Sequence, residues 1–395
     1  MTKQELLEEG IVRYGTPTYL FHGDEAERTV QSFRNVLGSR ADLCYAMKAN
    51  PFLTEEMGVL TDRVEVCSMG EYRICREIQL DPGKILVSGV MKEGKDISEI
   101  LNIYRGNCRY TAESVRQLQH FADWSNENRE RISLFLRLTS GNQFGMDKEI
   151  IQNIIKLKDA YPYLDILGIH YFSGTRKKSA DKSAEELKYL DAVLCGIKED
   201  TGFQIRELEY GPGLSVPYFT DQQNTQDKDL KKLADAMDKM KWKGKITLEI
   251  GRALSASCGF YLTAVKDIKQ NHGINYCIVD GGIHHLNYDG QIRGIYQPFF
   301  SVYPAGESAK AEHEWTVCGA LCTVNDVLMQ KVRIGNLQEG DIFIFENAGA
   351  YSMTEGMALF LSHPLPAAAL YSEKNGWQTL RERQSTYQWN MGKRR

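Results

Sequence analysis

Lys48 ends a strand-like run, ADLCYAM, and raises the question of what an amine does there. A lysine is costly to bury unless it is paired, exposed or used chemically. Two other stretches carry matching groups, namely EYGPGLS with Gly211 and Gly213, and LEIGRAL with Glu249 and Arg252. Glycines let backbone N–H groups approach an anion, and a guanidinium adds a charge-assisted contact. Together these groups suit a lysine Schiff base with pyridoxal phosphate, although each alone is typical of a surface lysine, a turn or an ion pair.

These residues must be positioned by a repeating strand–helix pattern. Helix-prone segments rich in Glu, Lys, Leu and Ala separate eight β-prone runs, which are LCYAMK, RVEVCS, KILVSG, NCRYTA, ISLFLRL, ILGIHYF, ELEYG and ITLEIGR. Such alternation implies parallel strands with right-handed crossovers. Eight units in this length favour an α/β fold with a (β/α)8 barrel over an open sheet.

In a (β/α)8 barrel, catalytic groups lie at the carboxyl ends of the strands. The predicted strand ends carry polar groups or glycines at Lys48, Ser68, Ser88, Arg137, His170, residues 211–213, Glu249 and Arg252. Because all eight ends face one cavity, this set predicts an active site in which Lys48 has partners.

The pattern changes after about residue 255 to short, alternating β-rich runs such as YLTAVKDI, WTVCGA and VLMQKVRI. This change predicts a second, mostly antiparallel β domain. The early run GTPTYLFHG lies outside the eight units and is expected at a domain edge. We therefore predict an N-terminal strand in residues 1–25 that joins the β domain, a barrel in 26–255 and the β domain in 256–395.

Bulk properties exclude several classes of function. With 395 residues and 42% hydrophobic content the chain can build large cores, and its net charge of −4 gives no footprint for nucleic acid. Its apolar runs are too short for a membrane span. The nine cysteines are scattered without a C-x-x-C pair, which favours reduced thiols in the cytoplasm. His284 and His285 lack further ligands at metal-site spacing, so no metal site is expected.

A series of motifs in fixed order resembles the fold-III pyridoxal-phosphate-dependent decarboxylases of diaminopimelate, ornithine and arginine. The motifs are TPTYLF, YAMKANP, VEVCSMGE, QFGMD, GIHYFSGT, GPG, LEIGRAL, VDGG, CTVND, NAGAY and SHPLP. The resemblance covers nearly the whole chain and implies an alanine-racemase-like barrel with a C-terminal β domain.

The resemblance also implies roles for individual residues. Lys48 would hold the cofactor, Glu249 would pair with its ring nitrogen, and Cys322 of a neighbouring subunit would return a proton to the α-carbon. Two half-sites then make one active site, so an obligate homodimer is implied. The remaining residues assigned to the cofactor by the resemblance are His170, Phe172, Thr175, Gly211, Gly213, Gly251, Arg252 and, from the neighbouring subunit, Tyr351.

Three positions depart from the family pattern. Phe172 replaces the second histidine of H-x-H, so an aromatic covers the ring face without a charge. Pro212 removes one backbone donor from the glycine-rich turn. Thr323 follows Cys322 where relatives place an acid for a distal ammonium, so a free diamino acid is a less favourable substrate. Thr323 and Asp326 are the candidate substrate residues.

The nearer resemblance is to the subgroup of glutamyl-carrier-protein decarboxylases in butirosin and siderophore biosynthesis, through Phe172, residues 174–175, the VPYF run and the Cys-Thr pair. It implies an amino acid with a modified distal end, such as one linked to an acyl carrier protein. Diaminopimelate decarboxylation, racemisation and a non-catalytic partner-binding role are the alternatives. Glu249 in LEIGR and the CTVND motif disfavour a racemase, and the presence of both Lys48 and Cys322 disfavours a non-catalytic homologue.

Overall fold

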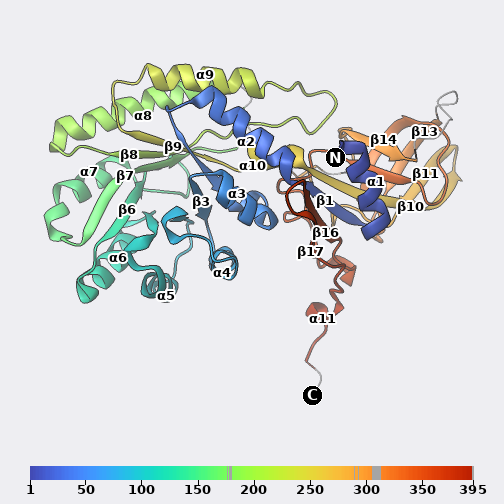
Figure 1. Cartoon of the computed structure of the whole chain (residues 1–395), viewed down its shortest axis with the longest axis horizontal. Coiled ribbons are helices and arrows are strands. Elements are labelled where there is room, and N and C mark those ends of the chain that lie inside the picture. The colour runs from blue at the N-terminus through green and yellow to red at the C-terminus, as the bar shows by residue number, and fades with distance from the viewer. Residues whose placement is uncertain (176, 178–179, 289, 292, 305–312, 394–395) are drawn as a thin grey trace. The chain divides into compact units, whose positions relative to one another are not determined.

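A computed structural model describes residues 1–175, 177, 180–288, 290–291, 293–304 and 313–393 (Figure 1). The chain divides into two compact units. The barrel unit comprises Thr29–Ser215 and Thr225–Leu254, and the sheet unit comprises Met1–Arg28, Val216–Asn224 and Ser255–Arg395.

The barrel unit contains a closed barrel of eight parallel strands that follow one another in chain order. All eight sequence-predicted strands are confirmed, as β2 (Asp42–Ala46), β3 (Arg63–Val66), β4 (Ile85–Val87), β5 (Arg109–Ala112), β6 (Ile132–Arg137), β7 (Leu164–Phe172), β8 (Glu207–Gly211) and β9 (Lys245–Ile250). The barrel closes where β2 pairs with β9, with Asp42 opposite Thr247 and Tyr45 opposite Ile250. The strands are largely buried, and in β3, β8 and β9 polar residues such as Arg63, Glu209 and Glu249 alternate with apolar ones.

A helix follows each barrel strand in the chain. These helices are α3 (Thr54–Leu60), α4 (Met69–Glu77), α5 (Gly94–Tyr104), α6 (Val115–Asn128), α7 (Lys148–Lys156), α8 (Ala180–Thr201), α9 (Gln226–Asp238) and the short α10 (Arg252–Ser255), while α2 (Gly23–Leu37) precedes β2. Helices α8 and α9 lie side by side (Figure 1), joined by the Lys232–Asp181 ion pair. The strand–helix order sets every strand's carboxyl end at one mouth of the barrel.

The barrel interior holds a buried ionic cluster. Arg63 donates to Glu209 at 2.7 Å and to Glu207 at 2.6 Å, and its side chain is only 3% exposed. A buried charge is tolerated only when it is paired, and the Arg63 guanidinium has both acids as partners. Burial still raises the pKa of Glu209, to about 8.

The sheet unit is built on one extended sheet with the strand order β14-β13-β11-β10-β1-β16-β17, while β15 pairs with β10 and β12. Its strands are β1 (Thr18–His22), β10 (Gly259–Asn271), β11 (Ile274–Val279), β12 (Phe300–Tyr303), β13 (His313–Cys318), β14 (Val327–Ile334), β15 (Ile342–Phe345), β16 (Ala367–Ser372) and β17 (Gly376–Arg381). Most pairs are antiparallel, but β1 pairs with β16 and β11 with β13 in parallel.

Strand β1 lies inside this sheet, between β10 and β16. The expectation that its run would lie at an edge was therefore wrong. All five residues of β1 are buried, which is typical of an inner strand covered on both faces.

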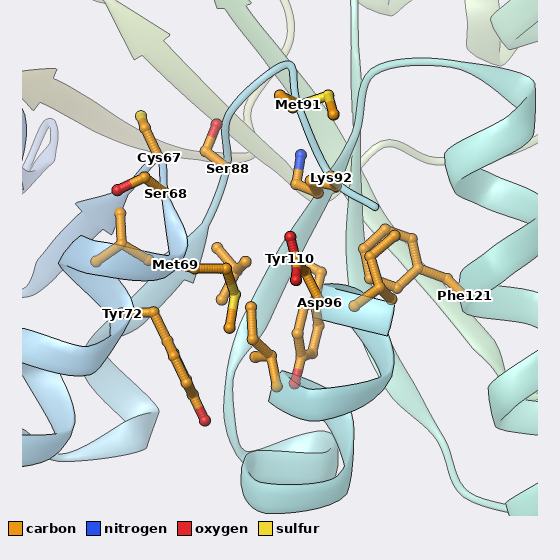
Figure 2. Close-up of a pocket in the computed structure, with 14 residues that line it drawn as sticks. Cys67, Ser68, Met69, Tyr72, Ser88, Met91, Lys92, Asp96, Tyr110 and Phe121 are labelled. Carbon is orange, nitrogen blue, oxygen red and sulfur yellow. The ribbon is translucent and has the colours of Figure 1, made fainter. Parts of the chain in front are cut away.

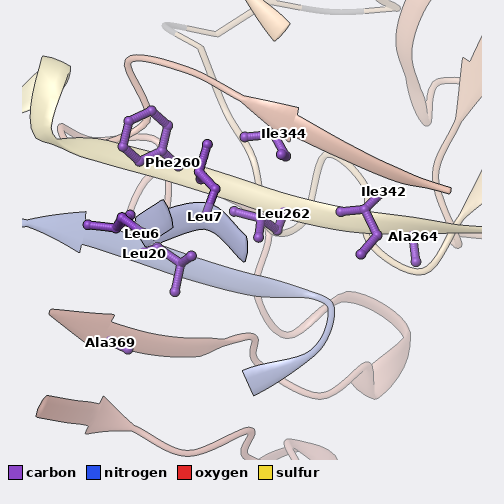
Figure 3. Packing of buried hydrophobic residues seen from close by; sticks show 9 residues of the cluster. All are labelled: Leu6, Leu7, Leu20, Phe260, Leu262, Ala264, Ile342, Ile344 and Ala369. Atoms are coloured by element: carbon purple, nitrogen blue, oxygen red, sulfur yellow. The ribbon is translucent and has the colours of Figure 1, made fainter. Parts of the chain in front are cut away.

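Two helices belong to the ends of the sheet unit, α1 (Lys3–Tyr14) and α11 (Tyr387–Asn390). A capping box starts α1, because the Thr2 hydroxyl accepts from Glu5 N at 3.3 Å and Glu5 accepts from Thr2 N at 2.7 Å. Leu6 and Leu7 of α1 are buried among residues of β1, β10, β15 and β16 (Figure 3). Each buried leucine contributes roughly 1.5–3 kcal/mol to the stability of the packing.

Among the described residues, no helix combines the length and the apolar composition needed to span a bilayer.

Candidate active site

Lys48 lies directly after β2, in a 3-10 turn formed by Met47–Ala49 at the barrel mouth. Its ammonium nitrogen lies 3.0 Å from Glu249 Oε1 and 2.5 Å from Glu65 Oε2. The Lys48 side chain is 36% exposed, whereas both carboxylates are buried. The strand-end lysine is therefore paired on its buried side and accessible on the other, as a nucleophilic amine needs to be.

Glu249, near the end of β9, is the centre of a hydrogen-bond chain. Its Oε1 accepts from Lys48, and its Oε2 lies 3.0 Å from His170 Nε2 on β7. Burial alone would raise the pKa of Glu249, but the charge of Lys48 and the hydrogen bond with His170 outweigh it and lower the pKa well below its ordinary value. The carboxylate is thus held ionised, and in the described part of the chain His170 Nδ1 has no hydrogen-bond partner.

Glu65 and Cys67 complete this cluster and were not singled out from the sequence. Cys67 Sγ donates to Glu65 Oε1 at 3.0 Å and lies 3.8 Å from Lys48 Nζ. Burial and the charge of Glu65 raise the pKa of the Cys67 thiol well above its ordinary value, so the thiol stays protonated. The sequence feature that could have identified them is their spacing of two residues in VEVCS. In a strand, this spacing places the Glu65 and Cys67 side chains on the same face, here beside β2. In the sheet, Ala46 at the end of β2 lies opposite Glu65.

Glycines in the segments after β7 and β8 make a close-packed turn at the same mouth. Gly213 has φ +64, and a Cβ there would lie 2.2 Å from Gly174 O. Lys177 N donates to Gly213 O at 3.0 Å, which fastens the two segments together. A Cβ on Gly211 would meet the Phe172 ring at 2.5 Å. Any larger residue would push these segments apart, so the glycines let the two backbone segments pack closely, as in glycine-rich turns that bind anions.

A third segment reaches this region from β9. A Cβ on Gly251 would lie 2.8 Å from Ala49 Cβ, so the glycine lets the β9–α10 turn pack against the turn that carries Lys48. The next residue, Arg252, is buried. Thr175, predicted to bind the phosphate, is exposed after β7. Amine, carboxylate, guanidinium and glycine cradle therefore come from strand ends of one barrel.

These residues fit pyridoxal phosphate. The cofactor needs an amine for its aldehyde, an ionised carboxylate for its ring nitrogen and a phosphate cradle, and the described residues supply all three in Lys48, Glu249 and the Gly213 turn. The part of the chain that the structure describes contains no group of three His, Cys, Asp or Glu side chains arranged for a metal ion.

The remaining predicted residues belong to the sheet unit. Cys322 is exposed in the turn between β13 and β14, and Val324 beside it is 84% exposed. Thr323 stabilises the turn, because its backbone oxygen accepts from Asp326 N at 3.2 Å. Tyr351 adopts a left-handed conformation with φ +63. The turn between β13 and β14 thus presents the Cys322 thiol, with the hydroxyl-bearing Thr323 next to it, at the surface of this unit.

Asp326, predicted to contact substrate, is directed into the protein. It is 2% exposed, and its carboxylate accepts from Leu321 N at 2.7 Å and from Ile283 N at 2.8 Å. Because both oxygens bind backbone amides, Asp326 holds the turn that carries Cys322 rather than presenting a charge to a ligand. The sequence showed the acid but not the direction of its side chain.

Comparison with known proteins identifies the family of this chain. The family model described as pyridoxal-dependent decarboxylase, C-terminal sheet domain, matches residues 34–349. The L-glutamyl-[BtrI acyl-carrier protein] decarboxylase of Niallia circulans is 27% identical over an alignment that covers 95% of this chain and 92% of the relative. The diaminopimelate decarboxylase of Vibrio cholerae is 26% identical, with 87% and 84% covered.

Solved structures share the fold. A diaminopimelate decarboxylase from M. jannaschii in complex with L-lysine has a TM-score of 0.81 at 23% identity, with 95% of this chain and 91% of that chain covered. The Helicobacter pylori diaminopimelate decarboxylase with L-lysine has a TM-score of 0.83 at 19% identity, with 97% and 98% covered.

Proposed function

Because this chain belongs to the pyridoxal-dependent decarboxylase family of ornithine, diaminopimelate and arginine decarboxylases, we propose that it removes the α-carboxylate of an amino acid whose distal end is masked. Glutamate linked through its side chain to an acyl carrier protein is the substrate that we favour. The observation that carries this choice is the exposed Cys322 turn, in which Thr323 offers only a hydroxyl and Asp326 is turned inward.

When bound, pyridoxal phosphate supplies an electron sink for the pair left behind by departing carbon dioxide. Lys48 Nζ would hold the cofactor, and the Gly213 turn and Arg252 would bind its phosphate. Glu249, kept ionised by Lys48 and His170, would keep the ring nitrogen protonated, which strengthens the sink. Phe172 and the buried strand ends limit access of water to the reacting carbon.

Cys322 is the proposed proton donor to the α-carbon, through its Sγ–H. Its exposure on the sheet unit fits a residue that acts in the site of a second copy of the chain. We therefore propose a homodimer with shared active sites, in which Tyr351 also reaches the partner's phosphate site.

The substrate assignment rests on charge. A distal ammonium in a dry site needs an opposing carboxylate. Leaving the ammonium unpaired lowers kcat/KM for a free diamino acid relative to a substrate without that charge. Neither Thr323 nor the inward Asp326 supplies that carboxylate from this turn. A distal end held in an amide or thioester has no such charge, and a hydroxyl can donate a hydrogen bond to its carbonyl. The likeness to the decarboxylase of Niallia circulans supports the same choice.

The test is carbon dioxide release by the cofactor-loaded protein. We would compare free diaminopimelate, lysine, ornithine, arginine and glutamate with glutamyl-carrier protein. Release from the carrier-linked substrate alone is the expected result. Efficient release from a free diamino acid would overturn the substrate proposal and leave the reaction type standing. Diaminopimelate is the second candidate, because several relatives with that activity match most of the chain.

A further inference from the structure

A separate cavity of about 230 Å³ lies in the barrel unit, outside the ring of strands (Figure 2). It lies between the ends of β3 and β4 and the helices α4, α5 and α6. The Lys48 amine does not line it, but Cys67 lines it and also donates to Glu65, the partner of Lys48. The cavity is thus a neighbour of the active site with one residue in common.

The loop between β4 and α5 forms the rim of this cavity and is held in place. Gly89 has φ +91, and a Cβ there would lie 2.4 Å from Cys67 O, so the loop packs on the end of β3. Lys92 donates to Gly89 O and to Gln117 Oε1, the latter at 3.3 Å. Gln117 in turn donates to Val90 O at 2.9 Å. The Lys92 ammonium is therefore positioned by α6 and by its own loop.

Buried polar groups on the lining have no protein partner among the described residues. Ser88, 3% exposed, and Tyr72, fully buried, are both lining residues, and within the described part of the chain neither hydroxyl makes a hydrogen bond. An unpartnered buried hydroxyl costs roughly 1–3 kcal/mol, and a ligand that supplied a partner would recover part of it. Burial also lowers the pKa of Lys92 to about 8 against the opposing effect of the Glu113 charge, and a bound anion would add to that opposing effect.

Two opposite charges lie on an otherwise largely apolar lining. Lys92 supplies a cation and Asp96, in the first turn of α5, supplies an anion, but the two do not form an ion pair. The apolar residues are Val66, Met69, Val87, Met91, Ile97, Ile100 and Phe121. Helices α4 and α5 both begin at this cavity, and their N-termini add partial positive charge near Ser68 and Asp96.

We propose that this cavity binds a free α-amino acid with an apolar side chain. The carboxylate would bind Lys92 and the Ser88 hydroxyl, the ammonium would bind Asp96, and the side chain would lie against Ile97, Ile100 and Phe121. The volume is that of about eight water-sized groups at ~30 Å³ each, which suits leucine or methionine. A ligand with only one of the two charges would leave Lys92 or Asp96 unmatched.

The test uses the cofactor-loaded full chain and titration calorimetry with L-leucine and L-methionine. N-acetyl-leucine and leucine methyl ester are the comparison ligands, because each lacks one charge. The visible absorption of the cofactor is recorded in the same titrations, since an amino acid that reached Lys48 would change that band.

The variants are Lys92→Met, Asp96→Asn and Ile100→Phe, the last of which fills the cavity. Lys95→Met is the matched control, because Lys95 is 76% exposed, pairs with Glu93 and does not line the cavity. Urea unfolding of each variant shows whether it folds like the parent.

We expect saturable binding of one L-leucine per chain with no change in the cofactor band. Lys92→Met and Asp96→Asn should each weaken it at least about tenfold, Ile100→Phe should abolish it, and Lys95→Met should leave it unchanged. Absence of saturable binding overturns the proposal, as does equal affinity in parent and Lys92→Met, or binding seen only with a changed cofactor band.

Discussion

The carboxylate of Glu65 lies 2.5 Å from the ammonium nitrogen of Lys48, closer than the 3.0 Å separating that nitrogen from Glu249. Lys48 therefore has two anionic partners of different kinds. Glu249 is joined to His170, whereas Glu65 is joined to the thiol of Cys67. The Glu249–His170 pair can serve the cofactor ring. The Glu65–Cys67 pair can only position Lys48 and stabilise its charge.

Replacement of Glu65 should therefore change the orientation and protonation of the Lys48 amine more than it changes the affinity for substrate. We expect Glu65→Gln to lower kcat about 10–100-fold with little change in KM, because a charged partner that orients the amine is lost. The cofactor's visible band should titrate at lower pH, since the loss of an anion disfavours protonation of the lysine nitrogen. Glu77→Gln, on the exposed face of α4, is the control. An unchanged pH titration would mean that Glu65 is merely structural.

Glu249 should be required for the electron sink. We expect Glu249→Gln to lower kcat at least about 100-fold while the cofactor stays bound, because a neutral amide cannot hold a proton on the ring nitrogen. His170→Ala should have a smaller effect, since Lys48 still holds the carboxylate. Stopped-flow absorbance and carbon dioxide release give the two readouts. Equal activity of Glu249→Gln and the parent would contradict this role.

Shared active sites predict complementation between two inactive chains. Lys48→Ala and Cys322→Ala should each lose activity alone, the first at the cofactor and the second at the proton return. Mixing them under conditions of subunit exchange should restore roughly a quarter of parental activity, because half of the dimers are mixed and each has one intact site. Two copies of Lys48→Ala mixed with each other are the control. No recovery despite proven exchange would place both residues in one chain's site.

Restoring an acid beside Cys322 should shift substrate preference. We expect Thr323→Glu to raise kcat/KM for a free diamino acid about tenfold or more and to lower it for the masked substrate. Thr323→Gln is the matched control for size without charge. Comparison of kcat/KM for both substrates in the three proteins gives the measurement, and a gain in the glutamine variant alone would indicate a shape effect.

The free energy of unfolding of the sheet unit should fall in mild acid because the unit contains two buried histidines. Burial lowers the pKa of His284 to about 3 and that of His285 to about 4. His285 Nε2 lies 2.8 Å from Pro364 O and Nδ1 lies 3.1 Å from the Tyr261 hydroxyl, a pairing suited to the neutral ring. In the unfolded chain both histidines bind a proton below about pH 6.5, whereas in the folded protein they stay neutral. The free energy of unfolding is therefore greatest above that pH and decreases below it.

At pH 5 we expect a loss of about 2 kcal/mol per histidine relative to pH 7. Urea titrations at both pH values, followed by tryptophan fluorescence, measure it. His284→Phe removes one titrating group and should reduce the pH dependence by about half, whereas His313→Gln, on the exposed face of β13, should not. A pH dependence unaffected by His284→Phe would assign the acid sensitivity to other groups.

The barrel could be predicted because its pattern repeats: each apolar run ends in a polar residue or glycine and a helical segment follows. Lys48, His170 and Glu249 were placed together by this rule alone, since parallel strands end at one mouth. Glu65 was overlooked because a carboxylate inside a strand becomes meaningful only beside its partner. No local pattern could show that Asp326 turns toward Leu321 and Ile283, which are made its neighbours by the fold.

Strand β1 shows the same limit. Its run YLF is too short to distinguish an inner from an outer strand, and its neighbours β10 and β16 come from residues more than two hundred positions later. Pairing over such a distance leaves no periodic signal in the sequence.

The inner position of β1 has a consequence for synthesis on the ribosome. The barrel has all its strands once Ile250 has been made, whereas β1 must wait for β16 at Ala367–Ser372 before its second flank is paired. Until then β1, which is translated early, lacks its neighbour on that side, and before Gly259–Asn271 is made it lacks both neighbours. Deleting residues 1–22 would therefore remove an inner strand of the sheet.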